Sequence, residues 1–457
     1  MNSILKIKRA TLVIPFLGLA FLLFICITLF SKNLSLGLSF CINSVLAFSI
    51  IIKNTNRNKI SIALNSISIF VLLFFVIAPI IQIELYNEGS RMVNNLPFNT
   101  NTAFYANIQI SLFLLTFLLT YFFVNIKQSS FVKFNYSKNF NNILIIISVL
   151  IFFLFARYVY NNMLKIEDNN ESIIVSLLLK KSMFMIPIAA FSIYLYHKNK
   201  ISFVLIFLVL VILFLKNPIS ERRNAIGPLY LAMGFYYFSS LYKTNFRSFI
   251  FIFFIFFFLF PLSGLLTNSY LPITERLGNL ETFINDGLGN NYFTNYFNTL
   301  HYDAWSNICA TIEYVKVDGL SMGYQFFGSI FFFVPRAIWP SKPIGTGHFI
   351  ANDFLIPQYN LWLSNISCPI ISEGYINFGI FGIILFAVIL AFMVKIFDKW
   401  VSSPDPLYKI FGIYSSFWLF YLMRGDLMSS WAYLCGAYIG IIIIPKTINK
   451  ILITKWI

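Results

Sequence analysis

The sequence predicts an all-α, polytopic integral membrane bundle. The 457-residue chain is 58% hydrophobic and only 11% charged, whereas soluble domains average about 25% charged residues. Apolar runs long enough to cross a hydrocarbon layer of about 30 Å recur from one end of the chain to the other. The positive charges cluster in the segments between every second pair of runs, as expected for cytoplasmic loops. A soluble enzyme is excluded by this composition.

About twelve spans are expected. The first begins after basic residues and has no small-residue cleavage site behind it, so it is predicted to be a retained span rather than a signal peptide. The expected spans lie near 11–31, 35–52, 60–82, 104–125, 142–160, 174–196, 201–215, 226–242, 248–266, 370–394, 410–424 and 429–445.

The basic residues predict the orientation of the bundle. With the N-terminus in the cytoplasm, the inside segments carry 19 of the 33 lysines and arginines, and only Asp398 and Asp405 of the 17 acidic residues. This excess of Lys and Arg places both termini inside. The net charge of +16 is therefore an orientation signal and does not indicate nucleic-acid binding.

One long external region interrupts the expected bundle. The chain divides into spans one to nine (1–266), an external loop region (267–369) and spans ten to twelve (370–457). Within the loop, Gly323–Val334 is too short for a full crossing and would invert the later spans, so we expect it to be re-entrant or to lie on the surface. Unpunctuated loops of this size are usually functional.

The segment Phe331–Gly347 carries cations in an apolar setting. Arg336 and Lys342 lie among prolines and glycines, and an uncompensated cation at membrane depth is costly, which predicts an anionic partner. An interfacial role, with Trp339 and the arginine anchoring the segment among lipid headgroups, is the alternative. His348, just beyond, is interpreted as a bystander within the same binding region.

A second basic group lies in the turn between the seventh and eighth spans, in KNPISERRN. Asn217, Arg222 and Arg223 are candidates for binding phosphate, because guanidinium groups donate in pairs to oxyanions. A solvated turn in which Glu221 neutralises one arginine is the alternative.

Further polar groups gather around the tenth span. Asn365 precedes it, and Glu373 and Asn377 lie one helical turn apart on one face. Glu373 is predicted either to form a structural salt bridge with an arginine or to orient substrate.

The last two spans are joined by Arg424-Gly-Asp426, in an otherwise apolar stretch. This pair either neutralises itself or faces a cavity.

Two secondary groups complete the candidates. Asp303 follows His301 in the external loop and could orient sugar hydroxyls or cap the next helix. Lys180 and Lys181 either extend to headgroups or add positive charge to a cavity.

The segments FVPRAIWPSKPIGTG and NISCPIISEGYINFG, with NPISERRNAIG before them and FYLMRGD after, resemble the Wzy-type oligosaccharide repeat-unit polymerases of O-antigen and capsule synthesis. The resemblance is strongest over about 300–385, and Arg336 and Gly347 fit an R-x₁₀-G spacing described for such polymerases. It implies a bacterial inner-membrane glycosyltransferase that joins undecaprenyl-pyrophosphate-linked oligosaccharide units on the outer face. Arg336, Arg222, Arg223 and Arg424 would bind the diphosphate, with Lys342 and Glu373 as further candidates.

Under this resemblance, a carboxylate accepts the proton of the attacking hydroxyl, and the candidates are Asp303, Glu373 and Asp426. The partners are a lipid-linked donor, a lipid-linked acceptor, the bilayer and a possible chain-length regulator. We expect no cofactor and no metal, because no acidic metal pair is evident. The alternatives are an O-antigen ligase, which uses the same donor, and a flippase or transporter, for which repeat symmetry and mid-helix charges are not evident.

Overall fold

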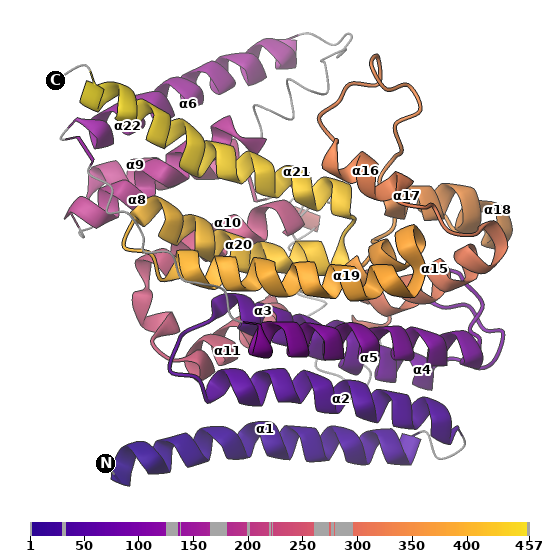
Figure 1. The fold of residues 1–457 in the computed structure, drawn as a ribbon. Helices are drawn as coiled ribbons and strands as arrows, with labels where there is room; N and C mark the ends of the chain where they lie inside the picture. Colours follow the sequence, from indigo (N-terminus) through magenta and orange to yellow (C-terminus); the bar gives the residue numbers. More distant parts are fainter. Residues whose placement is uncertain are drawn as a thin grey trace.

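The structure is a computed structural model. It describes residues 2–29, 33–124, 136–137, 139–164, 181–198, 202–218, 221, 223–259, 274–275, 278 and 296–454. Within these ranges every regular element is a helix, and the only β feature is an isolated bridge between Arg91 and Pro97. The long helices run side by side across the molecule (Figure 1). The expectation of an all-α bundle is therefore confirmed.

The N-terminal half contains α1 (Asn2–Leu29), α2 (Leu34–Thr55), α3 (Ile62–Phe70), η1 (Val71–Ile77), α4 (Ala78–Glu84), α5 (Thr100–Phe123), α6 (Phe140–Leu164), η2 (Met183–Met185), α8 (Ile186–Lys198) and α9 (Phe203–Leu215). The middle contains α10 (Arg223–Tyr237), η3 (Ser239–Tyr242), α11 (Asn245–Phe254), η4 (Ile255–Leu259), η5 (Leu300–Tyr302), α15 (Ala304–Asp318) and α16 (Tyr324–Ile330). The remainder contains α17 (Thr346–Ile350), η6 (Ala351–Leu355), α18 (Ile356–Tyr359), α19 (Ile370–Val401), α20 (Pro406–Arg424), α21 (Leu427–Tyr438), η7 (Ile439–Ile443) and α22 (Ile444–Thr454).

Six described helices are long and apolar enough to cross a membrane: Leu34–Thr55, Ile62–Glu84, Thr100–Phe123, Phe140–Tyr158, Ile370–Val401 and Leu427–Thr454. Four shorter apolar helices, Val13–Leu29, Met183–His197, Phe203–Leu215 and Asn245–Leu259, accompany them. The count of twelve spans and the cytoplasmic placement of the termini stay predictions.

Polar side chains define where many of these helices begin. The side chains of Asn33, Ser61, Asn99, Ser202 and Thr244 each accept a hydrogen bond from a backbone N–H in the first turn that follows. Such caps satisfy donors that have no partner within the helix. In an apolar chain they separate neighbouring spans that hydropathy alone would run together.

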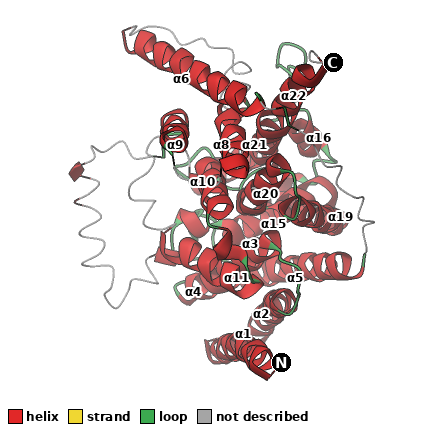
Figure 2. Cartoon of the chain, turned by 90° about the vertical axis from the view of Figure 1, so that its left-hand side faces the viewer, coloured by secondary structure: helices red, strands yellow, loops and turns green. Residues whose placement is uncertain are grey.

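The continuous helix α3–η1–α4 lies at the centre of the bundle. Its apolar window is 89% buried, as expected of a helix that is hydrophobic on all sides. Viewed along most of the helix axes, α3, α10 and α20 lie centrally, with α1 and α2 at one edge and α6 at the other (Figure 2). The helix α20 packs against α3, α10 and α19 and carries one part of the site described below.

The loops at one end of the bundle share a buried polar network. The hydroxyls of Ser61 and Tyr121 donate to Asp398, at 2.6 and 2.7 Å, and Arg57 donates to the Tyr121 hydroxyl. The side chain of Asn245 accepts from the Ser61 N–H at 2.8 Å. These segments, predicted to share the inner side of the membrane, do lie together.

The expected external loop region is in part a piece of the bundle. Its residues 304–312 form the buried face of α15, which packs against α5 and α19. Trp305 is fully buried and donates from Nε1 to Asn107 of α5 at 3.0 Å. The expected re-entrant segment contains only the seven-residue helix α16, and a re-entrant path for it stays a prediction.

Candidate functional site

A polar cavity of about 480 Å³ lies at the end of the bundle opposite the Asp398 network. It is enclosed by the turn between α20 and α21, the segment before α19, the end of α9, the beginning of α10 and the turn η5. Its lining residues are Lys181, Lys216, Glu221, Asn224, Leu300, His301, Asp303, Leu363, Asn365, Ile366, Ser367, Tyr421, Arg424, Gly425, Asp426, Ser429 and Tyr433. The volume falls within the roughly 300–1,000 Å³ range of small-molecule sites.

Arg424, the last residue of α20, is held by an ion pair. Its Nη2 lies 3.0 Å from Oδ1 of Asp303 and donates to the carbonyl of Leu300 at 2.7 Å. The Arg424 side chain is 18% exposed and that of Asp303 only 3%. Removing one partner of so buried a pair costs about 3–5 kcal/mol. The Nε of Arg424 is buried and has no hydrogen-bond partner among the described residues.

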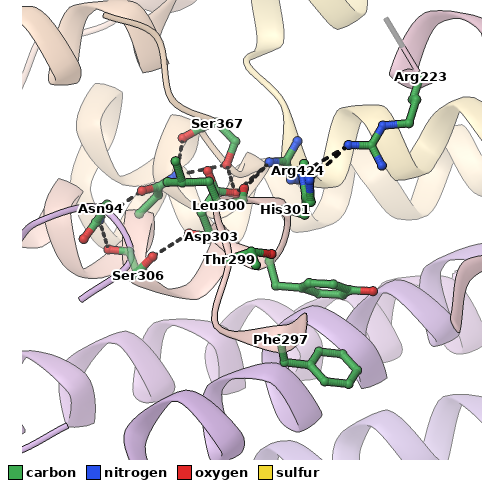
Figure 3. Close-up of polar contacts among 12 residues, drawn as sticks. Asn94, Arg223, Phe297, Thr299, Leu300, His301, Asp303, Ser306, Ser367 and Arg424 are labelled. Atoms are coloured by element: carbon green, nitrogen blue, oxygen red, sulfur yellow. Dashed lines mark hydrogen bonds and ion pairs between the residues drawn. The ribbon is translucent and has the colours of Figure 1, made fainter. Parts of the chain in front are cut away.

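Asp303 precedes α15, but its carboxylate does not cap that helix. It accepts from the Ser367 hydroxyl at 2.8 Å and pairs with Arg424 (Figure 3). Asn94 braces the first turn of α15 from a distant loop by donating to the Ser306 carbonyl at 2.8 Å. The predicted capping role of the Asp303 side chain is therefore wrong, and its role in orienting sugar hydroxyls stays a prediction.

His301 sits on η5 beside two guanidinium groups. Arg223 Nη2 lies 3.1 Å from Nδ1 of His301, and Arg424 approaches from the adjoining helix (Figure 3). Gln82 holds the turn by donating to the Phe297 and Tyr302 carbonyls at 2.7 and 3.1 Å. The pKa of His301 is lowered to about 3, because the imidazolium would be buried and would face both arginines. At neutral pH the imidazole is uncharged.

Two lysines add positive charge to the same cavity. Lys216 follows directly after α9, is 2% exposed, and places its ammonium 5.7 Å from the Phe184 ring. Lys181 places its ammonium 4.2 Å from the Tyr433 ring. Cation–π contacts of this kind stabilise a partly desolvated ammonium. Of the two roles open for Lys181, the cavity role is the one its position supports.

Asp426 brings a carboxylate to the cavity wall. It precedes α21 and accepts from the Ser429 N–H at 2.8 Å and from the Ser429 hydroxyl at 3.1 Å. A Cβ built on Gly345 would lie 3.1 Å from its carboxyl carbon. The carboxylate is therefore fixed in position by the helix end and by the backbone of a second segment.

Glu373 lies behind this wall and does not line the cavity. Its side chain is 1% exposed and accepts from the Thr346 hydroxyl and the Leu427 N–H, both at 2.8 Å. It therefore ties α17 and α21 to α19. No arginine pairs with Glu373 among the described residues, so the predicted salt bridge is not observed there.

Asn377 also has a bracing position. Its side chain donates to the Glu373 carbonyl at 2.8 Å and accepts from the Phe326 N–H at 3.0 Å. The next two residues, Phe378 and Gly379, leave helical geometry, and Gly379 has φ +61°. Asn377 therefore joins α16 to the kink in α19 and is not part of the cavity lining.

The loop that carries Arg336 and Lys342 is held by hydrogen bonds within the loop itself. Arg336 is exposed and donates to the Lys342 carbonyl at 2.7 Å, while Lys342 donates to the carbonyls of Phe332 and Val334 at 3.0 and 2.7 Å. Burial and the nearby Arg336 lower the pKa of Lys342. This loop projects beyond α16 and α17 (Figure 1), and neither cation lines the cavity.

Gly347 connects this loop to the cavity wall. A Cβ on Gly347 would lie 2.1 Å from the carbonyl oxygen of Ile366, so only glycine permits this approach. His348 lies against the Ser364 carbonyl. Both therefore pack against the segment that supplies Asn365, Ile366 and Ser367 to the cavity.

The predicted residues separate into three groups. Arg424, Asp303, Asp426 and Asn365 line the cavity, and Arg223 contacts His301 at its edge. Arg336, Lys342, His348, Glu373, Asn377 and the exposed Asn217 do not line it. Arg222 lies outside the described residues. Lys216, Asn224, Tyr421 and Tyr433 also line the cavity, and no role was predicted for them. The signal for Lys216 is its position directly after a wholly apolar helix.

The described ranges contain no group of three or more His, Cys, Asp or Glu side chains that could hold a metal ion. A scan of protein-family models and searches of curated proteins and solved structures found no match to this chain.

Proposed function

We propose that this protein is a bacterial inner-membrane glycosyltransferase that polymerises undecaprenyl-diphosphate-linked oligosaccharide units on the outer face. The observation that carries the proposal is the placement of Arg223 and Arg424 around the uncharged His301, at the edge of a cavity lined by carboxylates and amides. Asp303 balances one of the two guanidinium charges and His301 is uncharged, so the group retains a net positive charge that favours an anion.

The reaction transfers a glycosyl group between two lipid-linked molecules. The bond between the anomeric carbon and the diphosphate oxygen breaks, a hydroxyl of the acceptor sugar forms the new glycosidic bond, and the diphosphate leaves with its electron pair. Negative charge grows on the diphosphate as it departs, so fixed arginines in a poorly hydrated cavity lower the barrier. Losing one such contact typically costs about a hundredfold or more in rate.

Asp426 is the carboxylate best placed to accept the proton of the attacking hydroxyl. Asp303 is ion-paired with Arg424, and Glu373 does not line the cavity. Asp426 lines the cavity and is held rigidly by Ser429. Preorganised groups of this kind are the ones that serve in proton transfer.

The amide, hydroxyl and phenol groups of the lining suit oligosaccharide hydroxyls. Asn224 and Asn365 offer both donors and acceptors, and Tyr421 and Tyr433 offer ring faces with polar tips. These groups support a sugar ligand beside the arginines and give no information about which sugars are joined.

Charge-conserving arginine variants test the proposal. We expect Arg424→Lys to lower polymer formation about a hundredfold or more, because lysine keeps the charge but loses the fork that binds two oxygens. Arg336→Lys is the matched control and should leave polymer near normal, since among the described residues Arg336 forms its hydrogen bond within its own loop and does not line the cavity. Polymer length is measured on gels of surface glycans at matched protein abundance.

Normal polymer in Arg424→Lys would contradict the assignment of Arg424. Loss of polymer in Arg336→Lys would contradict the placement of Arg336 outside the site. Deletion of the gene distinguishes the ligase alternative. Loss of a polymerase leaves glycolipid with a single repeat unit, whereas loss of a ligase leaves long polymer on the lipid carrier.

A further inference from the structure

A second cavity, of about 260 Å³, opens beside the polar one between α10, η4 and α20. Carbon atoms dominate its wall, which includes Ile226, Leu231, Phe256, Leu259, Phe417 and Phe420. Phe256 and Phe420 stack with ring centroids 3.5 Å apart. A polar ligand would lose its hydration there without compensation, so the occupant must be hydrocarbon.

The two cavities meet at the arginines. Asn224, Tyr421 and Arg424 line both cavities, and Arg223 lines the apolar one while its guanidinium contacts His301. A ligand spanning the junction would therefore place an anionic group between a hydrocarbon chain on one side and a polar group on the other. The sequence of environments along this path is apolar, cationic, then polar.

We propose that the apolar cavity binds the head-proximal part of the polyprenyl chain of the lipid carrier, with the diphosphate on Arg223 and Arg424 and the sugar in the polar cavity. This inference rests on the proposed function and extends it to a chain-binding site. A volume of 260 Å³ admits one chain near its head, which fits a single isoprenoid chain and not the paired chains of a phospholipid. The remainder of the long chain extends into the bilayer.

Gly227 provides a direct way to fill this cavity. It lies on α10 in the cavity wall, and a Cβ at this position meets no heavy atom within 4 Å. A larger side chain at residue 227 would therefore extend into the space that the chain should occupy. Leucine favours a helix relative to glycine. Residue 227 precedes Pro228, however, and a proline ring crowds a Cβ on the helical residue before it, so the experiment includes a separate check that Gly227→Leu is folded.

Gly234 is a matched control on the same helix. A Cβ there also meets no heavy atom within 4 Å, and Gly234 does not line the cavity. Seven residues separate the two glycines, which places them on one face of α10 about two turns apart. Gly227→Leu and Gly234→Leu therefore make the same chemical change, inside and outside the proposed site.

The experiment measures binding to the full-length purified protein in detergent by thermal shift and by titration. The three probes are undecaprenyl diphosphate, inorganic pyrophosphate and dioleoyl phosphatidic acid. We expect undecaprenyl diphosphate to bind the unmodified protein and Gly234→Leu equally, and Gly227→Leu about tenfold more weakly or worse, since burial of the first isoprene units is lost. Inorganic pyrophosphate should bind all three proteins equally, which also shows that Gly227→Leu is folded.

Equal binding of undecaprenyl diphosphate to Gly227→Leu and the unmodified protein would overturn the chain site while leaving the proposed function standing. Phosphatidic acid binding as tightly as undecaprenyl diphosphate would overturn it in favour of a membrane phospholipid. Failure of the unmodified protein to bind both diphosphate probes would instead refute the proposed function.

Discussion

Replacing Glu373 by glutamine and by leucine separates a structural role from a chemical one. The carboxylate is 1% exposed and accepts two hydrogen bonds of 2.8 Å, from the Thr346 hydroxyl and the Leu427 N–H. Leucine leaves both donors buried without an acceptor. Each such group costs about 1–3 kcal/mol, so Glu373→Leu should lower the free energy of unfolding by about 2–6 kcal/mol.

Glutamine preserves this arrangement. Its carbonyl oxygen can accept from the Leu427 N–H, and its amide can donate to the Thr346 hydroxyl, which both donates and accepts. Only the difference in hydrogen-bond strength between a carboxyl group and an amide is lost, about 1 kcal/mol. If Glu373 braces the cavity wall, Glu373→Gln should therefore retain nearly normal polymer, while Glu373→Leu should lose both stability and polymer.

The assay compares denaturant unfolding in detergent micelles with polymer length on gels at matched abundance. A Glu373→Gln protein that is as stable as the unmodified one but makes no polymer would refute the bracing role and place the carboxylate in the chemistry. A Glu373→Leu protein of undiminished stability would refute the hydrogen-bond network itself.

Two further predictions follow from the same region. Gly347→Ala should lower both the thermal midpoint and polymer formation, because its Cβ would lie 2.1 Å from the Ile366 carbonyl oxygen and displace a cavity-lining segment; an unchanged midpoint in a thermal melt would contradict this close approach. His301 has a folded pKa of about 3 against an ordinary 6.5, so below pH 6.5 the unfolded chain binds a proton that the folded protein does not. Stability should therefore be full above pH 6.5 and fall toward pH 3 by about 1.4 kcal/mol per pH unit. Melts over this range should show a shallower pH dependence for His301→Gln, and an identical slope would exclude His301 as its source.

The location of the site depends on contacts between segments that are distant in sequence. Arg424, Asp303 and Ser367 meet although more than fifty residues separate each from the next, and no local pattern reports that pairing. Arg336 has the stronger local signature of a buried cation, yet it is exposed, and it donates to a carbonyl six residues away in its own loop. Local sequence indicates that a cation needs a partner; it does not indicate whether the chain supplies one.

Glu373 illustrates the same limit for acids. Its place near the start of an apolar helix predicts a buried carboxylate with a partner, and the burial is as expected. The partners are a hydroxyl and a backbone N–H instead of an arginine. Backbone donors at a helix start are available to any approaching carboxylate, so hydrogen-bonding capacity in the sequence does not identify which donor is used.

Composition and hydropathy by themselves determined the helical membrane class and most of the helix positions, because a chain in lipid must satisfy its backbone hydrogen bonds within each apolar segment. The caps at Ser61 and Asn99 are local features as well, since each acts on its own first turn. Only the tertiary structure decided that α15 enters the bundle, that Arg223 and Arg424 flank His301, and that an apolar cavity adjoins them. These features arise from packing between distant helices, whose mutual positions no single segment encodes.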